Sequence, residues 1–166
     1  MRDLNRIAVG AVVATVLMLG NGSVHAQEES KKPISLGLWN PIQIAKEDQS
    51  IGGFRFSLIY GKNANMTGLD IGLVNATTGS VTGVQGGLVG MTGSDFTGIA
   101  ANAVNLIDGE AKGVSFGFYN QAGHGNGVMI GLVNQAQTMN GLQIGLINII
   151  KQGGAFPVFP IVNWTF

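Results

Sequence analysis

The sequence predicts an all-β protein assembled from a repeat of about 15 residues. Each copy begins with a glycine, at positions 53, 68, 83, 98, 113, 127 and 141. Apolar residues alternate along each copy, as Leu69, Ile71 and Leu73 do around Asp70 and Gly72, and a period of two is typical of a strand. Glycines at fixed points of every copy disfavour a helix. A repeat this short cannot bury its own apolar side chains, so the copies must stack on or pair with their neighbours.

The expected elements follow the repeat. The clearest copies occupy 68–75, 113–120, 127–134 and 141–148, weaker ones begin at Gly83 and Gly98, and a degenerate one begins at Gly53. The segments 76–80, 91–95, 106–110 and 121–125 read as turns between strands. Before the repeats, 33–40 and 41–44 alternate as strands and 45–50 is a charged loop. After them come a break at 151–155 and an aromatic-rich end.

The first 26 residues are predicted to be a secretory signal peptide. Arg2 and Arg6 precede an apolar run from Ile7 to Gly20, and Val24 and Ala26 place small residues at a cleavage site. The run is shorter than the roughly 20 residues that span a bilayer. We therefore divide the chain into a signal peptide (1–26), a leader with an N-terminal cap or strand (27–50), a β-repeat domain (51–150) and a C-terminal aromatic strand or cap (151–166).

Composition narrows the function classes. The chain has nine Lys or Arg and nine Asp or Glu, and charged residues make up only 11% of it. This balance gives no basic patch for nucleic acid. The absence of cysteine excludes a disulfide framework and a lipoprotein anchor. Low charge combined with 27 glycines favours a repetitive β structure or a membrane-facing β surface over a soluble enzyme.

One architecture that fits is a β-solenoid, in which each repeat forms one coil. Two apolar stacks would then fill the interior, one running through Leu69 and Val84 and the other through Ile71 and Phe116. The polar row on the glycine face would decorate the outer surface: Asp70, Gln85, Ser115 and Gln143. The repeated asparagines would form a side-chain ladder at a corner, interrupted by Gly90: Asn75, Asn105, Asn120, Asn134 and Asn148.

The alternative is an up-and-down β-meander that closes into a small outer-membrane-type barrel, with the same polar row facing its lumen. Val162, Trp164 and Phe166 alternate at the chain end, and a terminal aromatic on an alternating strand is similar to the assembly signal of Gram-negative outer-membrane barrels. However, each copy has only three strongly apolar positions, fewer than a lipid-facing strand needs.

Candidate reactive residues are few. His124 is the only histidine after the signal peptide and has no partner in the sequence. Asp95, Asp108 and Glu110 lie in successive turns, but the Gly- and Asp-rich pattern of calcium-binding β-rolls is absent, so solvated turn carboxylates are the simpler interpretation. No catalytic set, cofactor motif or metal-ligand spacing can be assembled. The sequence therefore predicts a protein that is not an enzyme and needs no cofactor or metal.

The motif Gly-Leu-x-Ile-Gly-Leu-Val-Asn, best seen at 68, 127 and 141, resembles a family of exported bacterial surface-repeat proteins known from Leptospira and other Gram-negative groups. The resemblance covers roughly 53–166 and implies a location in the envelope. It supplies no catalytic residues. We expect a non-enzymatic exported protein of the cell envelope or surface, with a structural or binding role and outer-membrane or envelope components as partners. The alternative is a small barrel acting as a pore or anchor.

Overall fold

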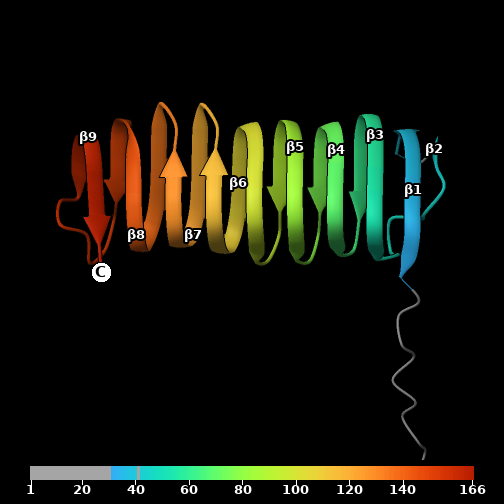
Figure 1. The fold of residues 1–166 in the computed structure, drawn as a ribbon, viewed down its shortest axis with the longest axis horizontal. Helices are drawn as coiled ribbons and strands as arrows, with labels where there is room; N and C mark the ends of the chain where they lie inside the picture. The colour runs from blue at the N-terminus through green and yellow to red at the C-terminus, as the bar shows by residue number, and fades with distance from the viewer. Residues whose placement is uncertain (1–30, 41) are drawn as a thin grey trace, which may run out of the picture.

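The computed structural model describes residues 31–40 and 42–166 of this chain. The described part contains strands and no helix, and its parallel coils stack into a β-solenoid of about seven turns (Figure 1). The expected signal peptide and the first residues of the leader lie outside the described residues. The all-β fold class and the solenoid predicted from the repeat are both confirmed.

The sheet follows the order of the chain, except that β2 lies outside β1. Strands β3 to β8 pair in parallel with their sequence neighbours, and the leading glycines are aligned, as Gly68 is with Gly83. A meander would pair consecutive strands antiparallel, so that alternative is wrong. The strands are β1 (Lys32–Trp39), β2 (Ile42–Gln43), β3 (Ile51–Asn63), β4 (Met66–Thr77), β5 (Val81–Thr92), β6 (Phe96–Phe116), β7 (Tyr119–Ile130), β8 (Val133–Ile150) and β9 (Val158–Thr165).

Two of the predicted turns lie inside strands. The segment 106–110 belongs to β6 and 121–125 belongs to β7, whereas the chain bends at 117–118 and 131–132. Ile107 is paired with Ala122 and Glu110 with His124, so the two predicted turns pair with each other, with an irregularity at Asp108 and Gly109. The contacts between coils thus override the local turn preference of Asp and Gly.

Antiparallel strands cover both ends of the stack. At one end β2 pairs antiparallel with β1, and at the other β9 pairs antiparallel with β8 (Figure 1). Leu142 lies opposite Trp164, and Ile144 lies opposite Val162. The terminal coils of the repeat therefore do not present a free parallel edge to further copies of the chain.

The leading glycine of each coil is required by its backbone. These seven glycines have positive φ angles between 117° and 156°, a region that side-chain-bearing residues rarely adopt. The coils also approach closely here, because a Cβ atom on Gly83 would overlap the carbonyl oxygen of Gly68. The most regular feature of the sequence therefore marks a point within the strands where each coil packs closely against the previous one.

The two apolar stacks predicted for the interior lie on the outside. Leu69 and Ile71 are each 40% exposed, whereas Asp70 between them is fully buried. Alternation showed which residues share a face but not which face points inward. The interior is crowded beside the repeated asparagines, since a Cβ atom on Gly72 would lie 2.6 Å from Oδ1 of Asn75. The buried apolar column instead contains Ile51, Met66, Val81, Phe96, Ala111 and Met139.

Candidate functional site

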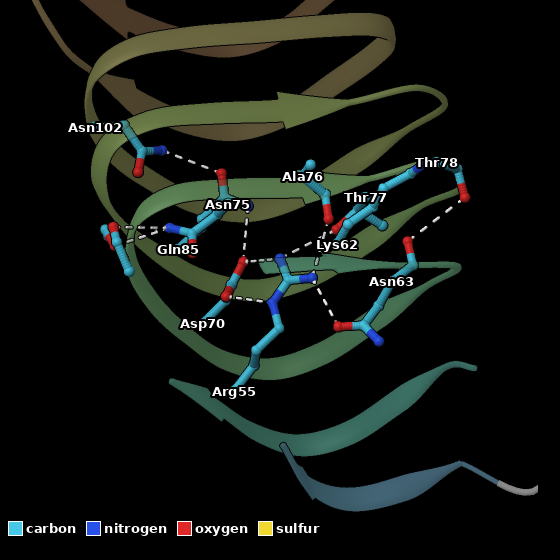
Figure 2. A network of polar contacts seen from close by, with 12 residues as sticks. Arg55, Lys62, Asn63, Asp70, Asn75, Ala76, Thr77, Thr78, Gln85 and Asn102 are labelled. Atoms are coloured by element: carbon cyan, nitrogen blue, oxygen red, sulfur yellow. Dashed lines mark hydrogen bonds and ion pairs between the residues drawn. The ribbon is translucent and has the colours of Figure 1, made fainter. Parts of the chain in front are cut away.

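The polar residues of the interior form a connected network that begins at Arg55 (Figure 2). Its guanidinium donates to Asp70 from Nε and Nη2, each over 2.6 Å, and both side chains are fully buried. The remaining donors of Arg55 reach Oδ1 of Asn63 at 3.2 Å, the carbonyl oxygen of Ala76 at 3.0 Å and Oγ1 of Thr77 at 3.2 Å. Because the pair is bidentate and further hydrogen-bonded, the charges are compensated inside the coil.

This network continues through the next coils. Gln85 donates to Asp70 Oδ2 at 2.9 Å, and its own Oε1 accepts from Nδ2 of Asn102 at 3.1 Å. Asn102 also donates to Asn105 Oδ1 at 2.7 Å. The row predicted to decorate the outer surface is therefore buried, and that expectation is wrong. Asp70, Gln85, Ser115 and Gln143 are all buried in the interior.

The repeated asparagines lie at one corner inside the coils. Asn105 donates from Nδ2 to Asn120, Asn120 to Asn134 and Asn134 to Asn148, over 2.7–2.8 Å. The same amide groups donate to the backbone of the following coil, as Asn120 does to the carbonyl oxygen of Ile130 at 3.0 Å. Asn75 stands apart from this run, because Gly61 and Gly90 occupy the equivalent positions on either side of it. The ladder ties the coils together from within.

In contrast to this polar interior, the outside of the coils carries a broad apolar face. We define the apolar face as the outward residues at three alternate positions of each coil, which in β4 are Leu69, Ile71 and Leu73. The same positions in the other coils hold Phe54, Phe56, Leu58, Val84, Gly86, Leu88, Ile99, Ala101, Ala103, Val114, Phe116, Phe118, Val128, Ile130, Leu132, Leu142, Ile144 and Leu146. Many of the large ones are well exposed, with Leu88 at 55% and Leu146 at 67%.

The area of the apolar face lies at the upper end of the range for the largest apolar patch on a monomeric protein, about 300–600 Å². With a strand spacing of about 4.8 Å and a rise of about 3.3 Å per residue, five residues across seven coils span roughly 550 Å². Monomeric soluble proteins rarely expose contiguous apolar patches above a few hundred Å², and larger ones mark interaction sites. Among the described residues, this is the surface feature with the clearest capacity to bind something.

An exposed ion pair lies near the N-terminal end of the stack. Near the N-terminal end, Lys62 Nζ is 3.0 Å from Glu47 Oε2. The hydrogen bond that Asn40 donates to Glu47, followed by the contact with Lys62, lowers the pKa of Glu47. The hydrogen bond and charge of Glu47 in turn raise the pKa of Lys62. This solvent-exposed pair contributes little to stability.

The other sequence candidates are dispersed. His124 Nδ1 contacts Thr138 Oγ1 at 2.6 Å on the neighbouring coil. Asp95 accepts from the backbone N–H of Glu110 at 2.8 Å, and Glu110 accepts from Asn126 at 2.9 Å. These carboxylates thus connect adjacent coils. Across the described residues, no three His, Cys, Asp or Glu side chains converge as a metal site would require.

The residues proposed as an assembly signal lie at the C-terminal end of the apolar face. Val162 and Trp164 are paired with Ile144 and Leu142, and directly opposed antiparallel residues share one side of a sheet. Phe166 is 91% exposed at the end of the chain. Phe156 stacks on Phe159 at a centroid distance of 4.4 Å and meets Trp164 edge-on. The structure brings Val162 and Trp164 onto the apolar face and leaves Phe166 beyond it.

The solenoid interpretation of the sequence missed the apolar face because it assigned the same residues to a core, although the barrel alternative faced them outward. A signal for it was present in the glycine column of Gly72 and its equivalents, which share a face with the repeated polar residues. Small residues at every coil indicate a crowded interior, not a surface. No family model matches the chain, and neither a curated protein nor a solved structure matches it significantly. In the part described, no helix is both long enough and apolar enough to traverse a bilayer.

Proposed function

We propose that this chain is a non-enzymatic, exported component of the cell envelope that has a structural or binding role through its apolar face. The observation that carries the proposal is the polarity of the coil, with Arg55, Asp70 and the asparagines buried and leucines exposed. An uncovered apolar surface of this extent favours a partner. The buried polar groups are inaccessible, so they suit a structural role better than chemistry on a substrate.

The export part of the proposal rests on residues 1–26. Its test is fractionation of cells that express the full chain, followed by mass spectrometry of the recovered protein. We expect the protein in the envelope fractions at the mass of residues 27–166. Leu17→Arg, which interrupts the apolar run of the signal peptide, is the matched control and should leave the uncleaved chain in the cytoplasm. Cytoplasmic recovery of the natural chain at full mass would contradict export.

The binding part is tested in the same cells by a carbonate wash of the membranes. We expect the natural chain to stay with the washed membranes, and deletion of Phe166 to show whether the terminal aromatic contributes. Complete release of the natural chain by the wash would contradict a tight attachment to envelope components. Retention that is unchanged on deleting Phe166 would remove this residue as an assembly signal while leaving the apolar face as the attachment.

A further inference from the structure

We propose that the apolar face binds the hydrocarbon surface of a lipid bilayer, with the long axis of the solenoid parallel to the membrane. This inference rests on the proposed function and names the partner of the same surface. The coils form a straight row in Figure 1, so equivalent side chains of successive coils project from the same side. A flat membrane can contact all of them together.

Charge is the first argument. Within the described coils, the segments that form the apolar face contain two ionisable residues, Arg55 and Asp70. Both point inward and are fully buried against each other. Burying the apolar face in hydrocarbon would therefore desolvate no charged side chain, which is the largest cost that such a transfer normally carries.

Backbone satisfaction is the second argument. The strands behind the apolar face pair with a neighbour on each side, so Leu69 lies between Phe54 and Val84 in continuous register. Backbone N–H and C=O groups that are paired within the sheet can approach hydrocarbon without losing a partner. An irregular surface of the same composition would lack this property.

The uneven relief of the apolar face and its lack of hydrogen-bonding side chains favour lipid over a protein partner. In the middle row of the apolar face, the small residues Gly86 and Ala101 lie between Ile71 and Phe116. An apolar hollow lies beside Gly86 and Leu88. Fluid acyl chains fill hollows of unequal depth. Protein interfaces instead carry about one hydrogen bond per 100–200 Å², and the outward side chains of this face offer no hydrogen-bonding groups. The observations therefore favour a bilayer over a second copy.

The tryptophans provide a built-in probe of the geometry. The chain has two, and Trp164 lies at the end of the apolar face opposite Leu142, 40% exposed. Trp39→Phe leaves Trp164 as the single tryptophan. If the face enters the hydrocarbon, phosphatidylcholine brominated on its acyl chains should quench Trp164 fluorescence, whereas bromide in the buffer should lose access to it.

The main experiment is flotation of the purified protein with neutral phosphatidylcholine vesicles. We expect binding that does not change between about 0.05 and 0.5 M salt, because no exposed charges are involved. The variant Leu88→Glu with Leu132→Glu places two carboxylates on exposed positions of the face and should reduce the bound-to-free ratio at least tenfold. The control, Thr78→Glu with Gln137→Glu, adds the same charge at exposed positions away from the face and should float like the natural protein.

Several results would overturn the lipid assignment. These are no flotation of the natural protein, equal flotation of both charge variants, or no quenching of Trp164 in the natural fold. A dimer in solution that Leu88→Glu with Leu132→Glu converts to a monomer, without vesicle binding, would assign the face to a second copy. Each result leaves the cellular fractionation unaffected, so an envelope protein that does not bind lipid is distinguished from one that is not exported. Circular dichroism of each variant verifies that it is folded.

Discussion

Asn102 fills the space that a side chain at Gly90 would occupy. Its Nδ2 atom lies 2.5 Å from the position of a Cβ atom on Gly90, and Oε1 of Gln85 lies even closer. In the other coils, except for Gly61 in the first, the position of Gly90 is an asparagine, and the position of Asn102 is most often a glycine. The break in the ladder is therefore a paired exchange between neighbouring coils, in which one amide replaces another in the interior.

This exchange predicts energetic coupling between the two positions. Gly90→Asn should destabilise the fold by about 1–3 kcal/mol through overpacking. Asn102→Gly should cost a similar amount because Gln85 and Asn105 lose their donor. The double variant restores the repeat pattern, with an asparagine at 90 and a glycine at 102. This pattern is compatible with Gln85, because the last coil has a glutamine and an asparagine at the equivalent positions, Gln143 and Asn148. Urea unfolding of all four proteins should give a double-variant loss well below the sum of the single losses, and additive losses would contradict the exchange.

The buried ion pair predicts that removing one charge destabilises the fold more than removing both. Asp70→Leu leaves the guanidinium of Arg55 buried without its carboxylate and should cost about 3–5 kcal/mol. Arg55→Met leaves the carboxylate of Asp70 buried without its guanidinium and should cost a comparable amount. The combined variant removes both charges and should be more stable than either single one in thermal and urea unfolding. A combined variant that is less stable than both would mean that the network contributes net stability through its other hydrogen bonds.

The inverted polarity of the coil predicts an unusual mutational pattern. Asn134→Ala leaves the donor of Asn120 and the acceptor of Asn148 without partners inside the coil, and should cost about 3 kcal/mol. Leu132→Ala in the same coil removes a side chain that is 49% exposed and should change the free energy of unfolding by less than about 1 kcal/mol. Urea unfolding measures both. A larger loss for the leucine would place it in a core and contradict the orientation of the coil.

Titration provides a fourth prediction, at the exposed N-terminal end. The hydrogen bond from Asn40 and the charge of Lys62 lower the pKa of Glu47 from its ordinary value of 4.5. Because the folded pKa is the lower one, the stabilisation is present above 4.5 and is lost as the pH falls through the folded value. Carboxyl NMR should show Glu47 titrating below its ordinary range, and Asn40→Ala should move the pKa upward. An unchanged pKa in that variant would remove the hydrogen bond as the main cause.

Much of the fold was predictable from local patterns. The glycines that begin each copy set the coil length, and alternation across Leu69 to Leu73 identified strands. The positions of turns were less predictable, because Asp108 and Gly109 favour a turn locally but lie within β6, at an irregularity between the paired residues Ile107 and Glu110. The candidate site was harder still. Its residues were visible in the sequence, but the same leucines serve equally well as a core in one orientation and as a surface in the other.

The sequence by itself determined the all-β class, the repeat and the residues that share each face, since these depend on periods of two and about 15 residues. Only the tertiary structure decided that the strands stack in parallel and that the polar face points inward. The physical reason is the space inside the coil. A Cβ atom on Gly72 would lie 2.6 Å from Oδ1 of Asn75, so the glycines leave room for the buried amides and one bidentate ion pair, and the leucines lie on the outside.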